Sequence, residues 1–144
     1  MNKSKADSCM ADFEPEEAKY ILEPDRRLTS LESWYHDKRL VPFGELSAWD
    51  VSRAITQRIC LEQLVPIAIE LLQENPMAGE WYEGDLLDAM RKVPIAYWST
   101  HIGQRDAMKI VCERVVEHED YKNDQADIDS ILDELKKNLT ADKA

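Results

Sequence analysis

The stretch Leu64–Leu87, LVPIAIELLQENPMAGEWYEGDLL, joins an apolar run to a run of aromatic and acidic residues. In its first half, apolar residues recur at intervals of three and four, which is the spacing of a helix with one buried face. We predict a helix from about Glu62 to Glu74, ended by Asn75-Pro76. The expected buried residues are Leu61, Leu64, Val65, Ala68, Leu71 and Leu72. This half is therefore expected to be scaffold.

Two sites in this region set the expected ends of helices. Pro66 has no backbone N–H and is best tolerated in a first turn, which predicts a helix start between Gln63 and Val65. Beyond the aromatic and acidic residues, Gly84-Asp85 opens a second, short helix with Asp85 as its N-cap and Pro94 as its stop.

Helix signals dominate the rest of the chain. Thr29 with Glu32, and Ser47 with Asp50, have the spacing of capping boxes. Apolar stripes continue through Val51, Ala54 and Ile55, through Met108, Val111, Cys112 and Val115 of a helix over Gln104–His118, and through Ile128, Ile131, Leu132, Leu135 and Leu139. Strand signals are scarce, since there are only four glycines and no hairpin dipeptide. We predict an all-α fold, a single compact bundle of about six helices over residues 1–144, with residues 1–12 flexible.

The formal charge of −11, from 29 acidic and 18 basic residues, restricts the possible partners. This negative charge opposes binding to nucleic acid or to an anionic membrane. Two explanations stay open: the protein binds a basic protein partner, or its acidity serves only solubility. No apolar run approaches the ~20 residues of a membrane span, and the N-terminus lacks the apolar core of a signal peptide. Three widely spaced cysteines, Cys9, Cys60 and Cys112, fit reduced thiols, and we expect a cytoplasmic protein.

The charge is distributed unevenly along the chain. Residues Leu61–Met90 include seven acidic residues and no lysine or arginine. The next stretch, Arg91–Cys112, has four bases and one acid, and the segment from Glu113 to the end has ten acids and five bases. The sequence therefore contains two acidic segments that are candidates for binding a basic partner.

No pattern of catalytic or metal-binding residues stands out. The glycines are too scattered for a phosphate loop, and zinc motifs are missing. The segment Asn123–Glu134 has the spacing of a calcium loop, but Ile128 occupies the position where the sharp turn requires glycine. Cys60 and Cys112 lie on or beside apolar helix faces, where thiols are usually inert. The histidines are expected to be exposed to solvent: His36, His101 and His118. We therefore predict no cofactor, no metal and no catalytic site.

Several motifs, in order, resemble the immunity proteins of bacterial contact-dependent growth inhibition (CDI) systems. The run Phe43–Gln57, FGELSAWDVSRAITQ, is followed by LVPIAIELL, which resembles the family's Leu-Val-Pro-Leu-Ala-Leu-Glu pattern. The later pieces are NPMA at 75–78, YEGDLL at 82–87 and Tyr97-Trp98. The resemblance covers about residues 30 to 98.

This resemblance implies a non-enzymatic protein that binds and neutralises the cognate C-terminal toxin domain of a CDI effector. Such toxins are often nucleases, including ones that cleave tRNA. A nuclease is basic around its active site, so an acidic inhibitor is steered to that site and excludes the substrate. We therefore expect toxin contacts in the base-free segment, at Glu70, Glu74, Glu80, Trp81, Glu83 and Asp88. Tyr82, Gly84 and Asp85 belong to the motif that the family shares and are better explained as scaffold.

Alternatives to this interpretation stay open at the level of the sequence. The acidic segment from Glu113 onward is a rival binding face. An acidic helical adaptor or regulatory protein without a toxin partner is the alternative function, and a hydrolase with an unrecognised cleft is a third. The sequence does not decide whether the chain associates with itself.

Overall fold

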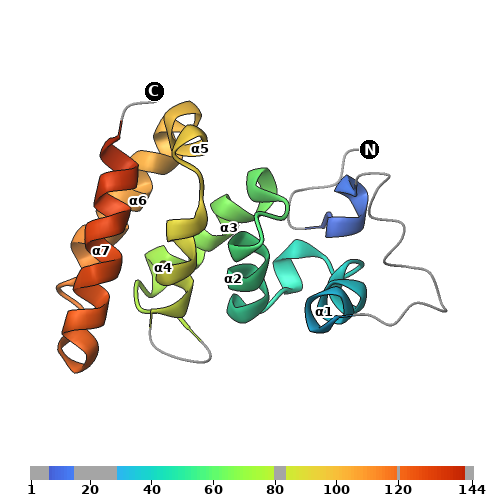
Figure 1. Ribbon diagram of the computed structural model, residues 1–144, viewed down its shortest axis with the longest axis horizontal. Helices are drawn as coiled ribbons and strands as arrows, with labels where there is room; N and C mark the ends of the chain where they lie inside the picture. Colours follow the sequence, from blue (N-terminus) through green and yellow to red (C-terminus); the bar gives the residue numbers. More distant parts are fainter. Residues whose placement is uncertain (1–6, 15–28, 80–83, 120, 142–144) are drawn as a thin grey trace. The chain divides into compact units, whose positions relative to one another are not determined.

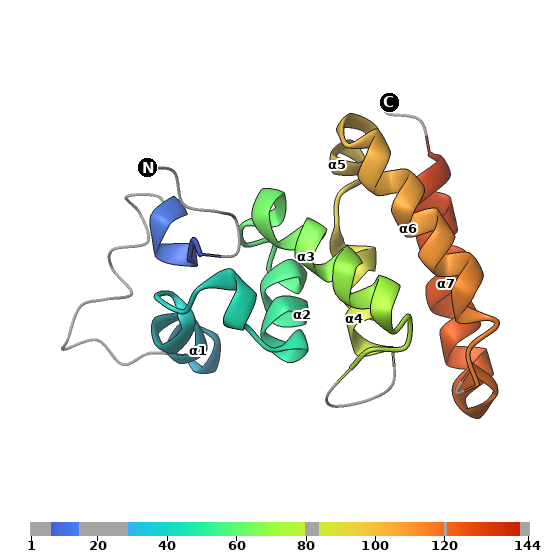
Figure 2. The same cartoon turned by 180° about the vertical axis from the view of Figure 1, so that it is seen from behind.

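The computed structural model describes residues 7–14, 29–79, 84–119 and 121–141. These residues form two compact units, Met1–Leu46 and Ser47–Ala144, and each is described here by itself. Within the described ranges there are seven α-helices, four short 3-10 helices and no strand (Figure 1 and, from behind, Figure 2), which confirms the all-α prediction. The single domain over residues 1–144 and the flexible residues 1–12 stay predictions. Among the helices of these ranges, none combines the length and the apolar character needed to cross a bilayer.

The first unit is built around η1 (Met10–Phe13), α1 (Ser30–Lys38) and η3 (Phe43–Glu45). Its helix α1 begins at the predicted capping box, in which the N–H of Glu32 donates to the Thr29 hydroxyl at 3.1 Å and the N–H of Thr29 donates to the Glu32 carboxylate at 3.0 Å. Because this box needs only residues three apart, the sequence alone was enough to place the start of α1.

Contacts between distant residues close the first unit. The N–H of Ala11 donates to the carbonyl of Arg39 at 2.9 Å, and the ring of Phe13 lies 6.1 Å from that of the buried Phe43. The Arg39 guanidinium also binds Glu14, with Nη2 and Oε2 3.1 Å apart. This hydrogen bond from Arg39 lowers the pKa of the Glu14 carboxyl. One backbone hydrogen bond and one ion pair therefore tie η1 to the end of α1.

The second unit contains the remaining elements. Its helices are α2 (Ala48–Thr56), α3 (Leu61–Glu74), α4 (Asp85–Ala89), α5 (Ile95–Thr100), α6 (Ile102–Val115) and α7 (Gln125–Thr140). Two 3-10 helices join them, η4 (Met90–Lys92) after α4 and η5 (Tyr121–Asp124) before α7. Helix α3 contacts α2, α4 and α6, while α6 also contacts α5 and α7 (Figure 2). The apolar stripes predicted for α2, α6 and α7 are all buried in this unit.

Helix α3 begins earlier than the sequence predicted. It starts at Leu61, so Pro66 is its sixth residue, and the expected start between Gln63 and Val65 is wrong. The reason lies in Cys60, which adopts a left-handed conformation (φ 52°) and whose carbonyl accepts the first helical bond from the N–H of Leu64 at 2.9 Å. Pro66 consequently lies in the helix interior, where it has no N–H to donate to the preceding turn.

The buried face of α3 is close to the predicted one. Leu64, Val65, Ala68 and Leu72 are buried as expected, and Ile69 joins them. Leu61 and Leu71, which we also predicted to be buried, are only half-buried. The helical period was therefore correct, and the face is rotated slightly from the predicted direction.

Helix α4 begins on a glycine and not on an aspartate. Gly84 is the N-cap, with φ at 85°, and Asp85 is the first helical residue, so the prediction of Asp85 as N-cap is wrong. A Cβ atom on Gly84 would lie 2.9 Å from Cδ1 of Ile128 in α7. The N–H of Gly84 donates to the carbonyl of Met77 at 3.0 Å, which fixes the turn. Asp85 itself is 3% exposed and belongs to the interior of the unit.

Candidate functional site

The outward face of α3 carries two carboxylates in succession. Glu70 and Glu74 are both exposed and lie four residues apart, hence one turn apart on the same side of the helix. Neither makes an ion pair or a side-chain hydrogen bond within the described part of the chain. These two predicted toxin-binding residues are therefore available to a partner.

Glu70 and Glu74 lie where a negative charge destabilises their own helix. A helix has a partial negative charge at its C-terminus, so acidic residues in the last turns are unfavourable by about 0.3–1 kcal/mol each. Glu74 is the last residue of α3 and Glu70 lies one turn earlier, and the last turn of α3 contains no basic residue. Charges that cost stability are typical of positions kept for binding.

Helices α3 and α6 lie side by side and run in the same direction. At one end, Nε2 of His101, the N-cap of α6, lies 3.0 Å from a carboxylate oxygen of Glu62 in the first turn of α3. At the other end, Nη1 of Arg114 donates to the carbonyl of Gln73 at 2.6 Å. Arg114 thereby caps the C-terminal end of α3, and the C-termini of the two helices lie at the same end of the pair.

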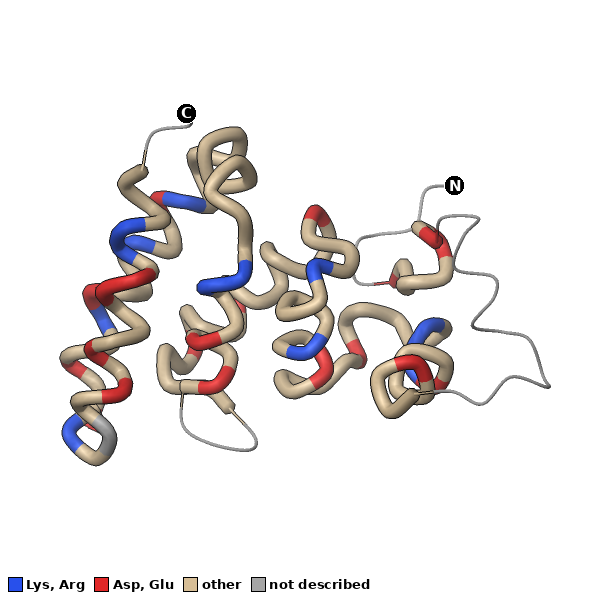
Figure 3. The backbone as a smooth tube through the Cα atoms, viewed as in Figure 1, with Lys and Arg blue, Asp and Glu red and all other residues tan. Residues whose placement is uncertain are grey.

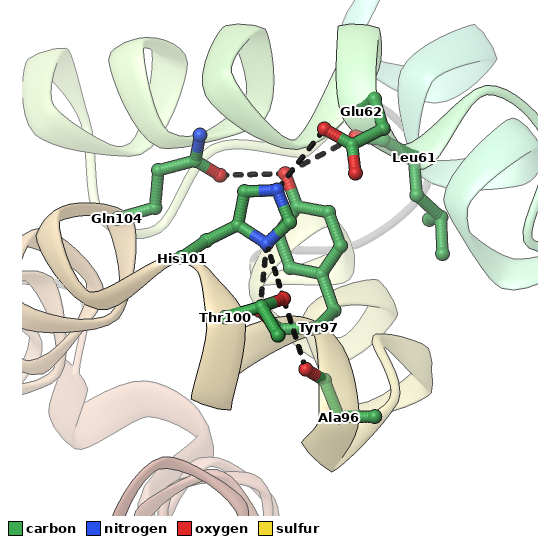
Figure 4. A network of polar contacts seen from close by, with 7 residues as sticks. All are labelled: Leu61, Glu62, Ala96, Tyr97, Thr100, His101 and Gln104. Atoms are coloured by element: carbon green, nitrogen blue, oxygen red, sulfur yellow. Dashed lines mark hydrogen bonds and ion pairs between the residues drawn. The ribbon is translucent and has the colours of Figure 1, made fainter.

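A polar network holds the N-terminal ends of this helix pair (Figure 4). The hydroxyl of Tyr97 donates to Oε1 of Gln104 at 2.6 Å, and its ring stacks on the imidazole of His101 with centroids 3.8 Å apart. Nδ1 of His101 lies 2.8 Å from the carbonyl of Tyr97. The prediction that His101 is simply exposed is wrong, because only 22% of its side chain is accessible.

The described residues offer little support for catalysis. Burial raises the pKa of the Tyr97 hydroxyl to about 12 and that of the Cys112 thiol to about 11, so both keep their protons at neutral pH. The network around His101 connects α3, α5 and α6, which gives it a structural role. No group of three or more potential metal ligands occurs among the described residues.

Asp88 differs from the two glutamates of α3. Its carboxylate accepts a hydrogen bond from Nη2 of Arg91, and Nη1 of Arg91 lies 2.8 Å from a carboxylate oxygen of Glu134 in α7. Only 24% of the Asp88 side chain is accessible, so this charge is engaged between α4, η4 and α7. Its contact with a toxin stays a prediction. Glu80, Trp81 and Glu83 lie outside the described residues, as does Tyr82.

The rival acidic segment has a structural explanation for much of its charge. Asp127 lies in the first turn of α7 and Lys137 in its last, which suits the helix dipole. Asp129 accepts a hydrogen bond from the hydroxyl of Tyr121, and Glu134 pairs with Arg91. Along α7 the acidic residues come first, and the two lysines follow in its C-terminal half (Figure 3). Asp127, Asp129 and Glu134 of α7 thus have a structural explanation, in contrast to Glu70 and Glu74 of α3.

The sequence did not predict the contacts by which α6 packs beside α3. The bond from Arg114 to Gln73 joins residues 41 positions apart, and no local motif indicates it. The His101–Glu62 contact spans 39 positions and was missed for the same reason. The one available signal was the helical spacing of both segments, which indicates two amphipathic helices without indicating that they are neighbours.

Comparison with known protein families gives a match over most of the chain. The sequence matches the family model of the CDI immunity proteins over residues 16–108, nearly two thirds of the chain. The matched range includes α1 to α5 and the first half of α6, and therefore all of the outward face of α3. No curated protein and no solved structure has significant similarity to the chain. The chain belongs to the family of CDI immunity proteins.

Proposed function

We propose that this protein works in the cytoplasm, where it binds the C-terminal toxin domain of its cognate CDI effector and covers the active site of that toxin with the outward face of α3. The toxin is a nuclease in this proposal, with tRNA as a candidate substrate. The observation that carries it is the pair Glu70 and Glu74, which are exposed, have no ion pair or side-chain hydrogen bond among the described residues, and are placed against the helix dipole. A basic phosphate-binding site is the natural complement of such a pair.

The geometry favours inhibition by occlusion. A tight protein inhibitor needs about 800 Å² of surface on each partner, of which two side chains supply only a small part. Helix α6 extends the face alongside α3, and Arg114 holds the two helices together next to Gln73. The contact is expected to spread from α3 onto α6, with the acidic end steering the encounter.

The test is inhibition of the purified toxin domain. Wild-type protein in molar excess should abolish nuclease activity, and the variant Glu70→Lys/Glu74→Lys should associate at least about tenfold more slowly, with a weaker dependence on salt. The matched control is Asp127→Lys/Asp133→Lys, which changes the net charge equally on the exposed side of α7. Circular dichroism should show that both variants remain folded.

Each outcome has a distinct meaning. Full toxin activity in the presence of excess wild-type protein would contradict the immunity function itself. If the α7 variant lost as much association rate as the α3 variant, overall charge and not the face of α3 would be responsible. A larger loss in the α7 variant would assign the toxin contact to the C-terminal acidic segment.

A further inference from the structure

An exposed isoleucine lies on the outward face of α6. Ile110 is 57% exposed, although its neighbours Met108 and Val111 are both fully buried. The helical period therefore directs Ile110 away from the interior of the unit. A single exposed apolar side chain is common on protein surfaces and does not indicate binding by itself. The surroundings of Ile110 decide whether it has a role.

The contacts at the two ends of the α3–α6 pair define which residues lie beside one another. His101 contacts Glu62, 39 positions earlier, and Arg114 contacts Gln73, 41 positions earlier. Since both helices have the same rise per residue, each residue of α3 lies beside the residue of α6 about forty positions later. Ile110 therefore lies at the level of Glu70.

Two further apolar residues line the seam between the helices. Pro66 lies two turns before Gln73, and hence on the side of α3 that faces α6. Ala107 lies two turns before Arg114, and hence on the side of α6 that faces α3. Both are half-buried. Together with Ile110 they form an apolar strip, which we call the seam patch.

Acidic residues border the seam patch on both helices. Glu70 lies one turn after Pro66 on α3, Asp106 lies one turn before Ile110 on α6, and both acids are exposed. Arg114, one turn after Ile110, is already engaged, because its guanidinium donates to a carbonyl of α3. An apolar centre with a charged rim is the usual composition of a protein–protein interface.

The charge around the seam patch selects the kind of partner. A second copy of this chain would bring the same acidic rim and a formal charge of −11 against the first copy, which opposes association. A basic protein that displays an apolar side chain among its lysines and arginines complements both the centre and the rim of the patch. The patch therefore fits the class of partner expected for Glu70 and Glu74.

We propose that Ile110 is the apolar anchor of the toxin contact and packs against an apolar side chain of the toxin domain that has basic residues beside it. This inference rests on the proposed function and names the residue that holds the complex together once it has formed. In this arrangement Glu70 and Glu74 govern the rate of association, whereas Ile110 governs the rate of dissociation.

The decisive variant is Ile110→Glu, with Ile102→Glu as its matched control. Ile102 is 55% exposed on the same helix, and it lies eight residues from Ile110, roughly 12 Å along the axis. Each change adds one negative charge, which by itself should speed association with a basic toxin. Ile110→Glu should nevertheless weaken toxin affinity by at least about tenfold, because it places a carboxylate against an apolar side chain, while Ile102→Glu should not weaken it.

Two further variants distinguish an apolar contact from a general disturbance of α6. Ile110→Leu keeps an apolar side chain of the same size and should bind toxin nearly as tightly as the wild-type protein. Ile110→Ala removes the contact without a change of charge, so it should speed dissociation equally at low and at high salt. The effect of Glu70→Lys/Glu74→Lys on association should shrink at high salt. Circular dichroism should show that each variant remains folded.

Equal toxin affinities of Ile110→Glu and Ile102→Glu, or tighter binding by Ile110→Glu, would overturn the inference and leave the proposed function in place. Failure of the wild-type protein to bind toxin would refute the proposed function and this inference together. Sedimentation velocity of the protein alone tests a second copy as the occupant. Self-association that Ile110→Glu abolishes, with toxin affinity unchanged, would assign the seam patch to that second copy and overturn the toxin contact.

Discussion

Gly84 determines how the chain enters α4. Its φ of 85° lies in the left-handed region, and an added Cβ would contact Ile128 of α7. Residues with a side chain are strained there by about 1–2 kcal/mol. We expect Gly84→Ala to lower the free energy of unfolding by about that amount, measured by urea denaturation with circular dichroism.

Gly103 provides the matched control for that substitution. It lies in the first turn of α6, and nothing is found within 4 Å of the position of its Cβ. Gly103→Ala should therefore leave stability unchanged or raise it by up to about 1 kcal/mol, because alanine reduces the freedom of the unfolded chain. Equal losses in both variants would show that the backbone of Gly84 has no special role.

At the level of single residues, local chemistry was predictable and distant contacts were not. The capping boxes at Thr29 and Ser47 were predicted correctly, because each depends on a residue three positions away. The N-cap of α4 was assigned to Asp85 because aspartate is a common N-cap. The actual N-cap, Gly84, is packed against α7, which lies more than forty residues along the chain.

At the level of elements, α3 carries charges that its own stability does not favour. Replacing Glu70 and Glu74 by glutamine removes two negative charges from the negative end of the helix and the repulsion between them. We expect the double variant to unfold with a free energy about 0.5–1 kcal/mol higher than wild type, in low salt, while inhibiting the toxin less well.

The variant Asp127→Asn serves as the control, because its expected change in stability is opposite to that of the α3 variant. Asp127 lies in the first turn of α7, where a negative charge suits the helix dipole, so its removal should lower stability by about 0.5 kcal/mol. High salt should reduce both effects. A loss of stability in the α3 variant would mean that its glutamates support the fold, and the argument for a binding role would lose its basis.

The spacing of apolar residues predicts the buried face of some helices, but it does not predict every helix end or every half-buried position. The stripes of α6 and α7 were predicted residue by residue because each has one continuous buried side. In α3 the half-buried positions of Leu61 and Leu71 depend on which neighbours cover the helix. The early start of α3 depends on the left-handed Cys60, a conformation that propensity disfavours in a residue with a side chain.

At the level of the whole molecule, the charge of −11 could be predicted to favour a basic partner, but its arrangement in space could not. The ion pairs and hydrogen bonds of Asp88, Asp129 and Glu134 give these acids partners within the fold. Glu70 and Glu74 remain outside such pairs in the described part of the chain. The candidate site therefore emerges only when tertiary contacts show which acids the protein uses internally.

In the alkaline range, the free energy of unfolding should depend on pH through two groups of the second unit, the Cys112 thiol and the Tyr97 hydroxyl. Burial raises the pKa of Cys112 to about 11 and that of Tyr97 to about 12, above their values of 9.0 and 10.0 in the unfolded chain. Because the folded state holds these protons more tightly, their contribution is complete below about pH 9 and is lost as pH rises through the folded values. Each group contributes a slope of at most about 1.4 kcal/mol per pH unit.

We therefore expect the free energy of unfolding to decline above about pH 9, as measured by urea denaturation from pH 7 to 11. The variant Cys112→Ala should be less stable at pH 7, because it leaves a cavity in the core, and its decline should be shallower. Lysine deprotonation is common to both proteins and cancels in the comparison of slopes. Parallel curves for the two proteins would show that the Cys112 thiol titrates alike in the folded and unfolded states, contrary to its burial between α6 and α7.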